Sequence, residues 1–158
     1  MAYTAIDLLD KIIYTGEKSK SMYDSSLEES EKNTANYIVI KIISKNLGEN
    51  IEYFKKLKEE TYGVDLEEID FVIYDKISFL INGFTYKIIM EDVMDIKNTI
   101  ESYIDFQKEV LGLFISIKGR LVKDEKDLKT KVYEILYSMI KEKRENIEKL
   151  EEFIKAYS

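Results

Sequence analysis

Two stretches of this 158-residue chain read almost alike: Glu49–Leu57 is ENIEYFKKL, and Glu145–Phe153 is ENIEKLEEF. Residues at helical spacing extend the likeness upstream, and every matched pair is offset by 96 residues. The first seam is Ile40, Ile43, Leu47, Asn50, Phe54 and Leu57, and the second seam is Leu136, Met139, Lys143, Asn146, Leu150 and Phe153. The likeness ends one turn further upstream, where Asn36 falls opposite Val132. One helical unit therefore occurs twice, which predicts a duplicated helical hairpin.

The composition favours long helices and excludes several kinds of active site. The chain has no proline, a residue that breaks helix interiors. Charged residues make up 35% of the chain and alternate with Ile, Leu, Phe and Tyr, as amphipathic helices require. Because cysteine and histidine are both absent, disulfides, thiolate–metal sites, cysteine nucleophiles and serine–histidine catalysis are excluded.

The charge pattern gives no sign of a nucleic-acid or membrane partner. The net charge is −7, and no basic stripe that could bind a phosphate backbone is visible. Asp7, Asp10 and Lys11 interrupt any apolar signal-peptide core near the N-terminus. No stretch approaches the ~18 apolar residues that a membrane span needs. We therefore expect a cytoplasmic protein.

Apolar spacing predicts a single all-α domain that contains four long helices. The expected helices are about Thr4–Leu27, Thr34–Thr61, Ile96–Leu121 and Lys126–Ala156. Short connections make the helices antiparallel within hairpin one (residues 4–62) and within hairpin two (residues 96–157). A long crossover, residues 63–95, joins the hairpins, so the expected architecture is an antiparallel four-helix bundle.

The crossover is expected to contain a short helix. Asp65 has the character of an N-cap, which predicts a helix over Leu66–Ile81. Asn82 and Gly83 form a dipeptide typical of a break. The weak alternation of Phe84–Met90 indicates an extended segment.

The two seams also resemble a known family. Leu47–Leu57 resembles the second-helix signature of rubrerythrin-related proteins, which belong to the ferritin-like superfamily, and Lys143–Leu150 resembles their fourth-helix signature. The helix lengths and the long crossover match as well, so the resemblance covers nearly the whole chain. It implies a ferritin-like bundle, in which two helices each give a glutamate and two each give Glu-x-x-His to a di-iron site.

The resemblance places the di-iron ligands of the second and fourth helices on residues of other types. The glutamate of the first Glu-x-x-His falls on Leu47, and its histidine falls on Asn50. The glutamate of the second motif falls on Lys143, and its histidine falls on Asn146.

In the family, the ligand glutamates of the first and third helices usually precede an aromatic residue by seven positions. Counting back from Tyr23 and Phe114 reaches Gly16 and Gln107. A shift of one residue would make Glu17 the first ligand instead. All six ligand positions depart from the family's pattern, and Gln107 is at best a weak oxygen ligand. Even with Glu17 only one carboxylate remains, so we expect no metal and no cofactor.

Lys143 and the two seam asparagines are expected to be buried. A lone ammonium on the inner seam must be paired or have its pKa lowered. We expect a pair with Glu17; the alternative is a stem that snorkels outward and keeps its charge in water. Asn50 and Asn146 are expected to fix the helix register, with amides that bond each other or hold a buried water.

These residues predict a non-catalytic structural or binding module of ferritin-like type that has lost its di-iron ligands. One alternative is a metal-binding or redox protein whose remodelled site uses iron, Glu17, Gln107 and neighbouring carboxylates. Another is an interaction module whose helix packing is convergent. A homodimer through the crossover is expected, because one short helix cannot bury all of Phe71, Val72, Ile73, Tyr74, Ile77, Phe79, Leu80 and Ile81.

Overall fold

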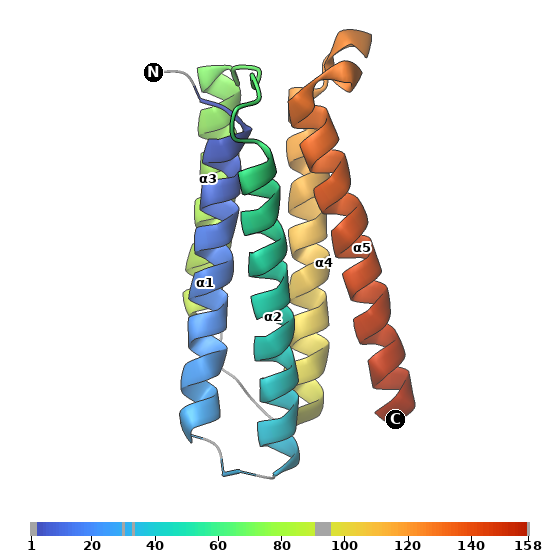
Figure 1. Cartoon of the computed structure of the whole chain (residues 1–158). Helices are drawn as coiled ribbons and strands as arrows, with labels where there is room; N and C mark the ends of the chain where they lie inside the picture. The colour runs from blue at the N-terminus through green and yellow to red at the C-terminus, as the bar shows by residue number, and fades with distance from the viewer. Residues whose placement is uncertain (1–2, 30, 33, 91–95, 158) are drawn as a thin grey trace.

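The computed structural model describes residues 3–29, 31, 32, 34–90 and 96–157, and this part of the chain is all-helical (Figure 1). The elements in chain order are α1 (Ala5–Glu29), α2 (Ala35–Glu60), α3 (Phe71–Met90), α4 (Ile96–Leu121), a 3-10 helix η1 (Glu125–Lys129) and α5 (Lys131–Tyr157). Apart from an isolated bridge between Tyr3 and Ile69, the described residues contain no β-structure. The predicted all-α class is therefore confirmed.

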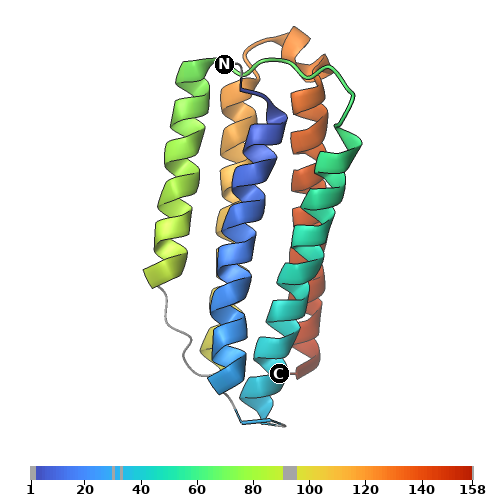
Figure 2. The same ribbon diagram turned by 60° about the vertical axis from the view of Figure 1, so that its left-hand side comes forward.

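The helices lie lengthwise beside one another (Figures 1 and 2). α1 and α2 are antiparallel neighbours, and so are α4 and α5. α2 and α4 contact each other and run in the same direction, because α3 leads the chain back along α1 before α4 begins. α3 also contacts α4, so the crossover helix covers a groove between two long helices.

Both predicted seams face the interior. In the first seam Leu57 is partly buried and the rest are buried, namely Ile40, Ile43, Leu47, Asn50 and Phe54. In the second seam Phe153 is half-buried, and the buried members are Leu136, Met139, Lys143, Asn146 and Leu150. The matched faces of α2 and α5 thus supply much of the core, as amphipathic spacing requires.

Aromatic side chains connect α2 to the second pair of helices. The rings of Phe54 and Phe114 meet edge to face, with centroids 5.9 Å apart. The hydroxyl of Tyr53 donates to the carbonyl oxygen of Ser138 on α5 at 3.2 Å. Such ring pairs contribute about 0.5–1.5 kcal/mol beyond the area they bury.

The crossover differs from the sequence-based expectation in its start and its continuity. The helix begins at Phe71 rather than Leu66, because Asp70 is the residue that caps it: its Oδ1 accepts from the backbone N–H of Val72 at 2.9 Å. The predicted break at Gly83 is wrong, and so is the extended segment after it, because α3 continues to Met90.

The cost of keeping Gly83 inside a helix is small. A glycine inside a helix costs only about 0.5–1 kcal/mol relative to alanine. Ile77 and Ile81, on the turns before Gly83, are 0% and 2% exposed and anchor that part of α3 in the core. The local preference of Asn82 and Gly83 for a break is therefore too weak to end the helix.

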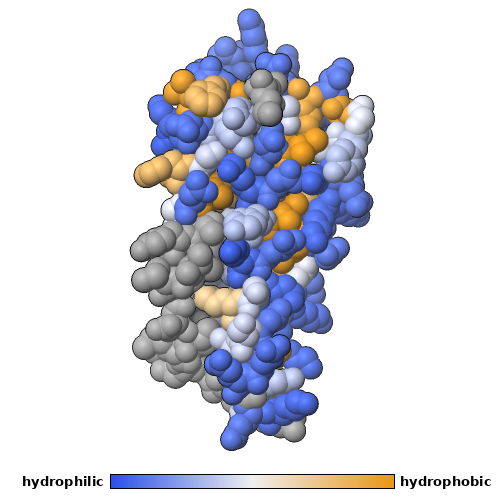
Figure 3. All heavy atoms as spheres, turned by 90° about the vertical axis from the view of Figure 1, so that its left-hand side faces the viewer, coloured by the Kyte–Doolittle hydropathy of each residue, from blue (hydrophilic) through white to orange (hydrophobic). Residues whose placement is uncertain are grey.

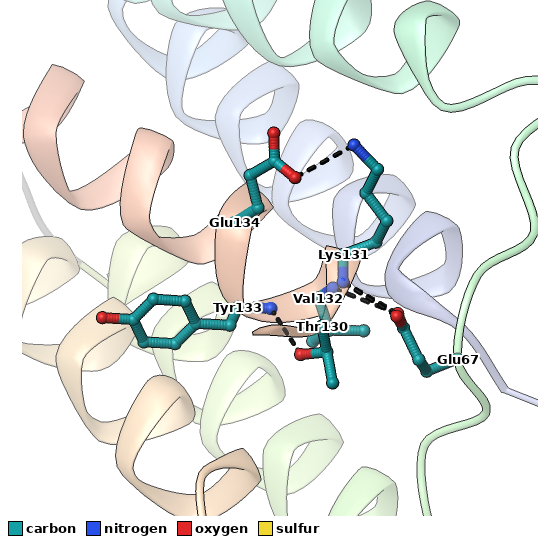
Figure 4. A network of polar contacts seen from close by, with 6 residues as sticks. All are labelled: Glu67, Thr130, Lys131, Val132, Tyr133 and Glu134. Carbon is teal, nitrogen blue, oxygen red and sulfur yellow. Dashed lines mark hydrogen bonds and ion pairs between the residues drawn. The ribbon is translucent and has the colours of Figure 1, made fainter. Parts of the chain in front are cut away.

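The last helix begins later than expected. Residues 125–129 form η1, and α5 starts at Lys131 rather than Lys126. The carboxylate of Glu67 accepts from the backbone N–H groups of Lys131 at 2.9 Å and Val132 at 3.3 Å (Figure 4). A carboxylate at a helix N-terminus satisfies free N–H groups and complements the helix dipole. This contact joins the loop before α3 to the start of α5.

None of the helices in the described part of the chain combines the length and the apolar character that crossing a membrane requires.

Candidate functional site

A small cavity lies in the interior, against residues of all five α-helices. Its volume is about 50 Å³. Most of its wall is apolar, and its polar members are Thr15, Ser19, Asn50, Gln107 and Lys143. We call this space the central cavity.

Five of the six positions that the resemblance selects line the central cavity. They come from four different helices: Gly16 of α1, Leu47 and Asn50 of α2, Gln107 of α4, and Lys143 of α5. The sixth, Asn146, is buried but does not line it. Positions far apart in the sequence therefore meet at one level of the core.

Lys143 is buried, as expected, and its partner is an amide. The residue is only 4% exposed, so its stem does not snorkel into water. Its Nζ donates to Oε1 of Gln107 at 2.6 Å and lies 5.9 Å from the centroid of the Phe54 ring. A desolvated cation over an aromatic face gains about 2 kcal/mol.

The surroundings of Lys143 favour its neutral form. Burial lowers the pKa of the Lys143 ammonium from 10.5 to about 8, and the carboxylate of Glu142 on the same helix opposes that shift. Within the described residues, no carboxylate forms an ion pair with it. The predicted lowering of the pKa agrees with this environment.

The predicted pair between Lys143 and Glu17 is wrong. Glu17 is exposed, and its Oε1 lies 3.4 Å from Nζ of Lys55. Successive residues of an α-helix point about 100° apart, so Glu17 faces away when Gly16 faces the cavity. The register with Gly16 at the cavity is the observed one.

Gly16 also lets α1 and α2 approach closely. A Cβ atom added at Gly16 would lie 3.1 Å from Cγ1 of Ile51, closer than nearly all such contacts. Any side chain here, including a carboxylate, would require Ile51 to move.

The two seam asparagines do not bond to each other. Nδ2 of Asn50 donates to Oδ1 of Asn46 at 3.5 Å, the outer limit for such a bond. Within the described residues, the buried Oδ1 of Asn146 has no hydrogen-bond partner. A buried acceptor of this kind costs about 1–3 kcal/mol unless water satisfies it.

The sequence reasoning missed Asn46 and Tyr103. The buried hydroxyl of Tyr103 donates to Oδ1 of Asn46 at 2.5 Å, and burial raises the pKa of Tyr103 well above its ordinary value. Asn46 precedes Asn50 by four residues and therefore shares its face. The four-residue spacing of Asn46 and Asn50 could therefore have predicted that both amides lie on the same face of α2.

The residues of the central cavity do not fit a di-iron site. Iron sites of the ferritin-like type need several carboxylates and histidine nitrogens. Here the polar groups are amides, hydroxyls and an ammonium, and Oε1 of Gln107 already accepts from Lys143. Among the described residues, no group of three or more histidine, cysteine, aspartate or glutamate side chains could hold a metal ion.

No protein-family model, curated protein or solved structure matches this chain. Its function must therefore be argued from its own residues.

Replacing Lys143 with methionine should stabilise the protein at neutral pH. A fall in pKa from 10.5 to about 8 corresponds to a penalty of about 3 kcal/mol for the charged form. Removing the amine avoids this penalty, but loss of the hydrogen bond to Gln107 costs roughly 1–2 kcal/mol and so offsets part of the stabilisation. We expect Lys143→Met to raise the free energy of unfolding at pH 7 by about 1–2 kcal/mol, measured by urea denaturation.

The advantage of Lys143→Met should disappear at high pH. Between pH 8 and 10.5 the unfolded chain binds more protons at Lys143 than the folded chain, so wild-type stability gains with rising pH. Lys149→Met, an exposed change on the same helix, is the control and should show no such trend. A loss of about 3 kcal/mol or more for Lys143→Met at pH 7 would mean that a stranded carboxylate faces the site.

Proposed function

We propose that this chain is a ferritin-like helical protein in which Lys143 and Gln107 occupy the place of a lost di-iron centre. In this proposal it acts as a non-catalytic binding or structural module. The observation that carries it is the convergence on the central cavity of Gly16, Leu47, Asn50, Gln107 and Lys143, which the motif register selects. Positions chosen on four helices without this register would not be expected to line a single cavity.

The connectivity supports the same proposal. Two antiparallel pairs, α1 with α2 and α4 with α5, are joined by a crossover that makes α2 and α4 parallel. One long crossover between two hairpins is the arrangement of ferritin-like folds. The helix α3 fills this crossover.

The charge of the site supports a role without metal. An ammonium supplies positive charge at the level where the family keeps its metal ions, and Gln107 offers it a neutral oxygen at 2.6 Å. With neither histidine nor cysteine in the chain, the usual general base and the strongest nucleophile are missing.

The alternative of a remodelled iron site lacks a carboxylate at the cavity. It depends on Glu17, whose side chain is exposed and pairs with Lys55. The proposal without metal therefore accounts better for the geometry.

Restoring the family's ligands should restore iron binding. The variant combines Gly16→Glu, Leu47→Glu, Asn50→His, Gln107→Glu, Lys143→Glu and Asn146→His. We expect about two iron ions per chain after anaerobic loading with Fe²⁺, measured by elemental analysis, because five of these six positions line the central cavity. The wild-type chain, treated identically, should retain almost none.

Two results would overturn the proposal. One is a wild-type chain that binds stoichiometric iron. The other is a restored variant that keeps its helical circular dichroism and cooperative unfolding but holds no iron. Leu47→Glu with Lys143→Glu alone serves as a simpler variant, whose carboxylates should bind Fe²⁺ weakly.

We also propose that the chain forms a homodimer through the outer face of α3. Phe71, Val72 and Phe79 are 64%, 59% and 78% exposed, whereas Ile77 and Ile81 are buried in the chain's own core. Val72 and Phe79 lie two turns apart and so share a face. In Figure 3, the upper part of the side that carries α3 shows apolar side chains in separate patches among hydrophilic ones. Exposed apolar patches commonly mark interfaces.

Charge on this face should separate the dimer. We expect sedimentation velocity at micromolar concentration to give a species of twice 18.6 kDa for the wild-type chain and 18.6 kDa for Val72→Glu with Phe79→Glu. Ile38→Glu, at a position on α2 that is 50% exposed, is the control and should stay dimeric. A wild-type chain that sediments only as a monomer contradicts the proposal.

A further inference from the structure

Lys143 carries a charge that nothing on the wall of the central cavity balances. Among the described residues that line the cavity, it is the one charged side chain, and its Nζ donates to the neutral Oε1 of Gln107. An ammonium has three donors, so two remain for other acceptors. A buried cation without an anion is costly, and an anion entering the cavity would relieve that cost.

The rest of the wall defines what kind of anion would fit. Ser19 and Asn50, which are 2% and 7% exposed, add a hydroxyl and an amide to the polar part. The remaining surface is apolar and includes Ile51, Phe106 and Leu113. The ligand should therefore have one charged end and one apolar end.

The volume of the cavity limits the size of the ligand that it can hold. A single water needs roughly 10–15 Å³ of such space, so 50 Å³ holds about three to five non-hydrogen atoms. Acetate and propionate have this size. Nucleotides and fatty acids are far larger, and inorganic phosphate would leave the apolar wall without a partner.

We propose that the central cavity binds a small monocarboxylate of the size of acetate or propionate. Its carboxylate pairs with Nζ of Lys143, and its alkyl end packs against the apolar wall. This inference rests on the proposed function, since it requires an ammonium rather than a metal ion at the site.

Binding should depend on the protonation of Lys143. Among the described residues, Glu142 on α5 is the charged group that acts on it, Glu17 on α1 faces Lys55, and the cavity-lining residues of α2, α3 and α4 are uncharged. The charged amine is the form that binds a carboxylate, and its pKa in the free protein is about 8. Affinity should therefore fall about thirtyfold between pH 7 and pH 9.5.

Isothermal titration calorimetry at constant ionic strength tests the proposal with sodium propionate and its neutral analogue propionamide. We expect propionate to bind the wild-type chain at pH 7, and propionamide to bind at least about thirtyfold more weakly. Lys143→Met should lose propionate binding by about the same factor. Lys149→Met, the exposed control on α5, should bind as the wild type does.

Equal affinity for propionate and propionamide would overturn the inference, and so would affinity that does not change with pH or with Lys143→Met. Absence of propionate binding at pH 7 would overturn it as well. If Lys143→Met fails to fold, two measurements on the wild-type chain still test the inference. They are the comparison of propionate with propionamide and the pH dependence of propionate binding. A chain that binds neither iron nor propionate refutes only this inference, whereas stoichiometric iron refutes the proposed function.

Discussion

The burial of one ammonium group in the middle of the helical core is the constraint on which the site depends. Nζ of Lys143 has left water, and a single amide oxygen on α4 at 2.6 Å replaces part of its hydration. The ring of Phe54 and the cavity reduce the remaining desolvation cost of the ammonium. An ammonium sealed completely into apolar packing would lose most of its charge to deprotonation. The lowered pKa of Lys143 is therefore a consequence of this burial.

The helices that bring Lys143 and Gln107 together are positioned by contacts outside the site. Rings and hydroxyls join α2 to α4 and α5, and the carboxylate of Glu67 joins the crossover loop to the start of α5. Gly16 allows α1 to approach α2 where the cavity lies. The site thus combines tight packing on one side with open space on the other.

The amino-acid sequence predicted the inward faces of α2 and α5, because the spacing of apolar residues determines which side of a helix is buried. The family's motif register also selected Gly16, Leu47, Asn50, Gln107 and Lys143, which line the central cavity, but it did not predict the cavity itself. Sequence reasoning failed in the crossover, where Gly83 indicated a break but α3 continues to Met90, because one glycine costs a helix only about 0.5–1 kcal/mol. It also paired Lys143 with the wrong side chain. Sequence spacing sets the relative directions of Gly16 and Glu17, but only the packed structure shows which of them faces α5.

The most direct test of this account is the titration of the Lys143 amine itself. Nuclear magnetic resonance of chain labelled with ¹³C at the lysine Cε atoms would follow each amine, and the signal missing from Lys143→Met would identify the residue. We expect a midpoint near pH 8 for the Lys143 amine. A Lys143 signal that titrates near 10.5, the ordinary lysine value, would contradict the burial of its ammonium without a carboxylate partner among the described residues.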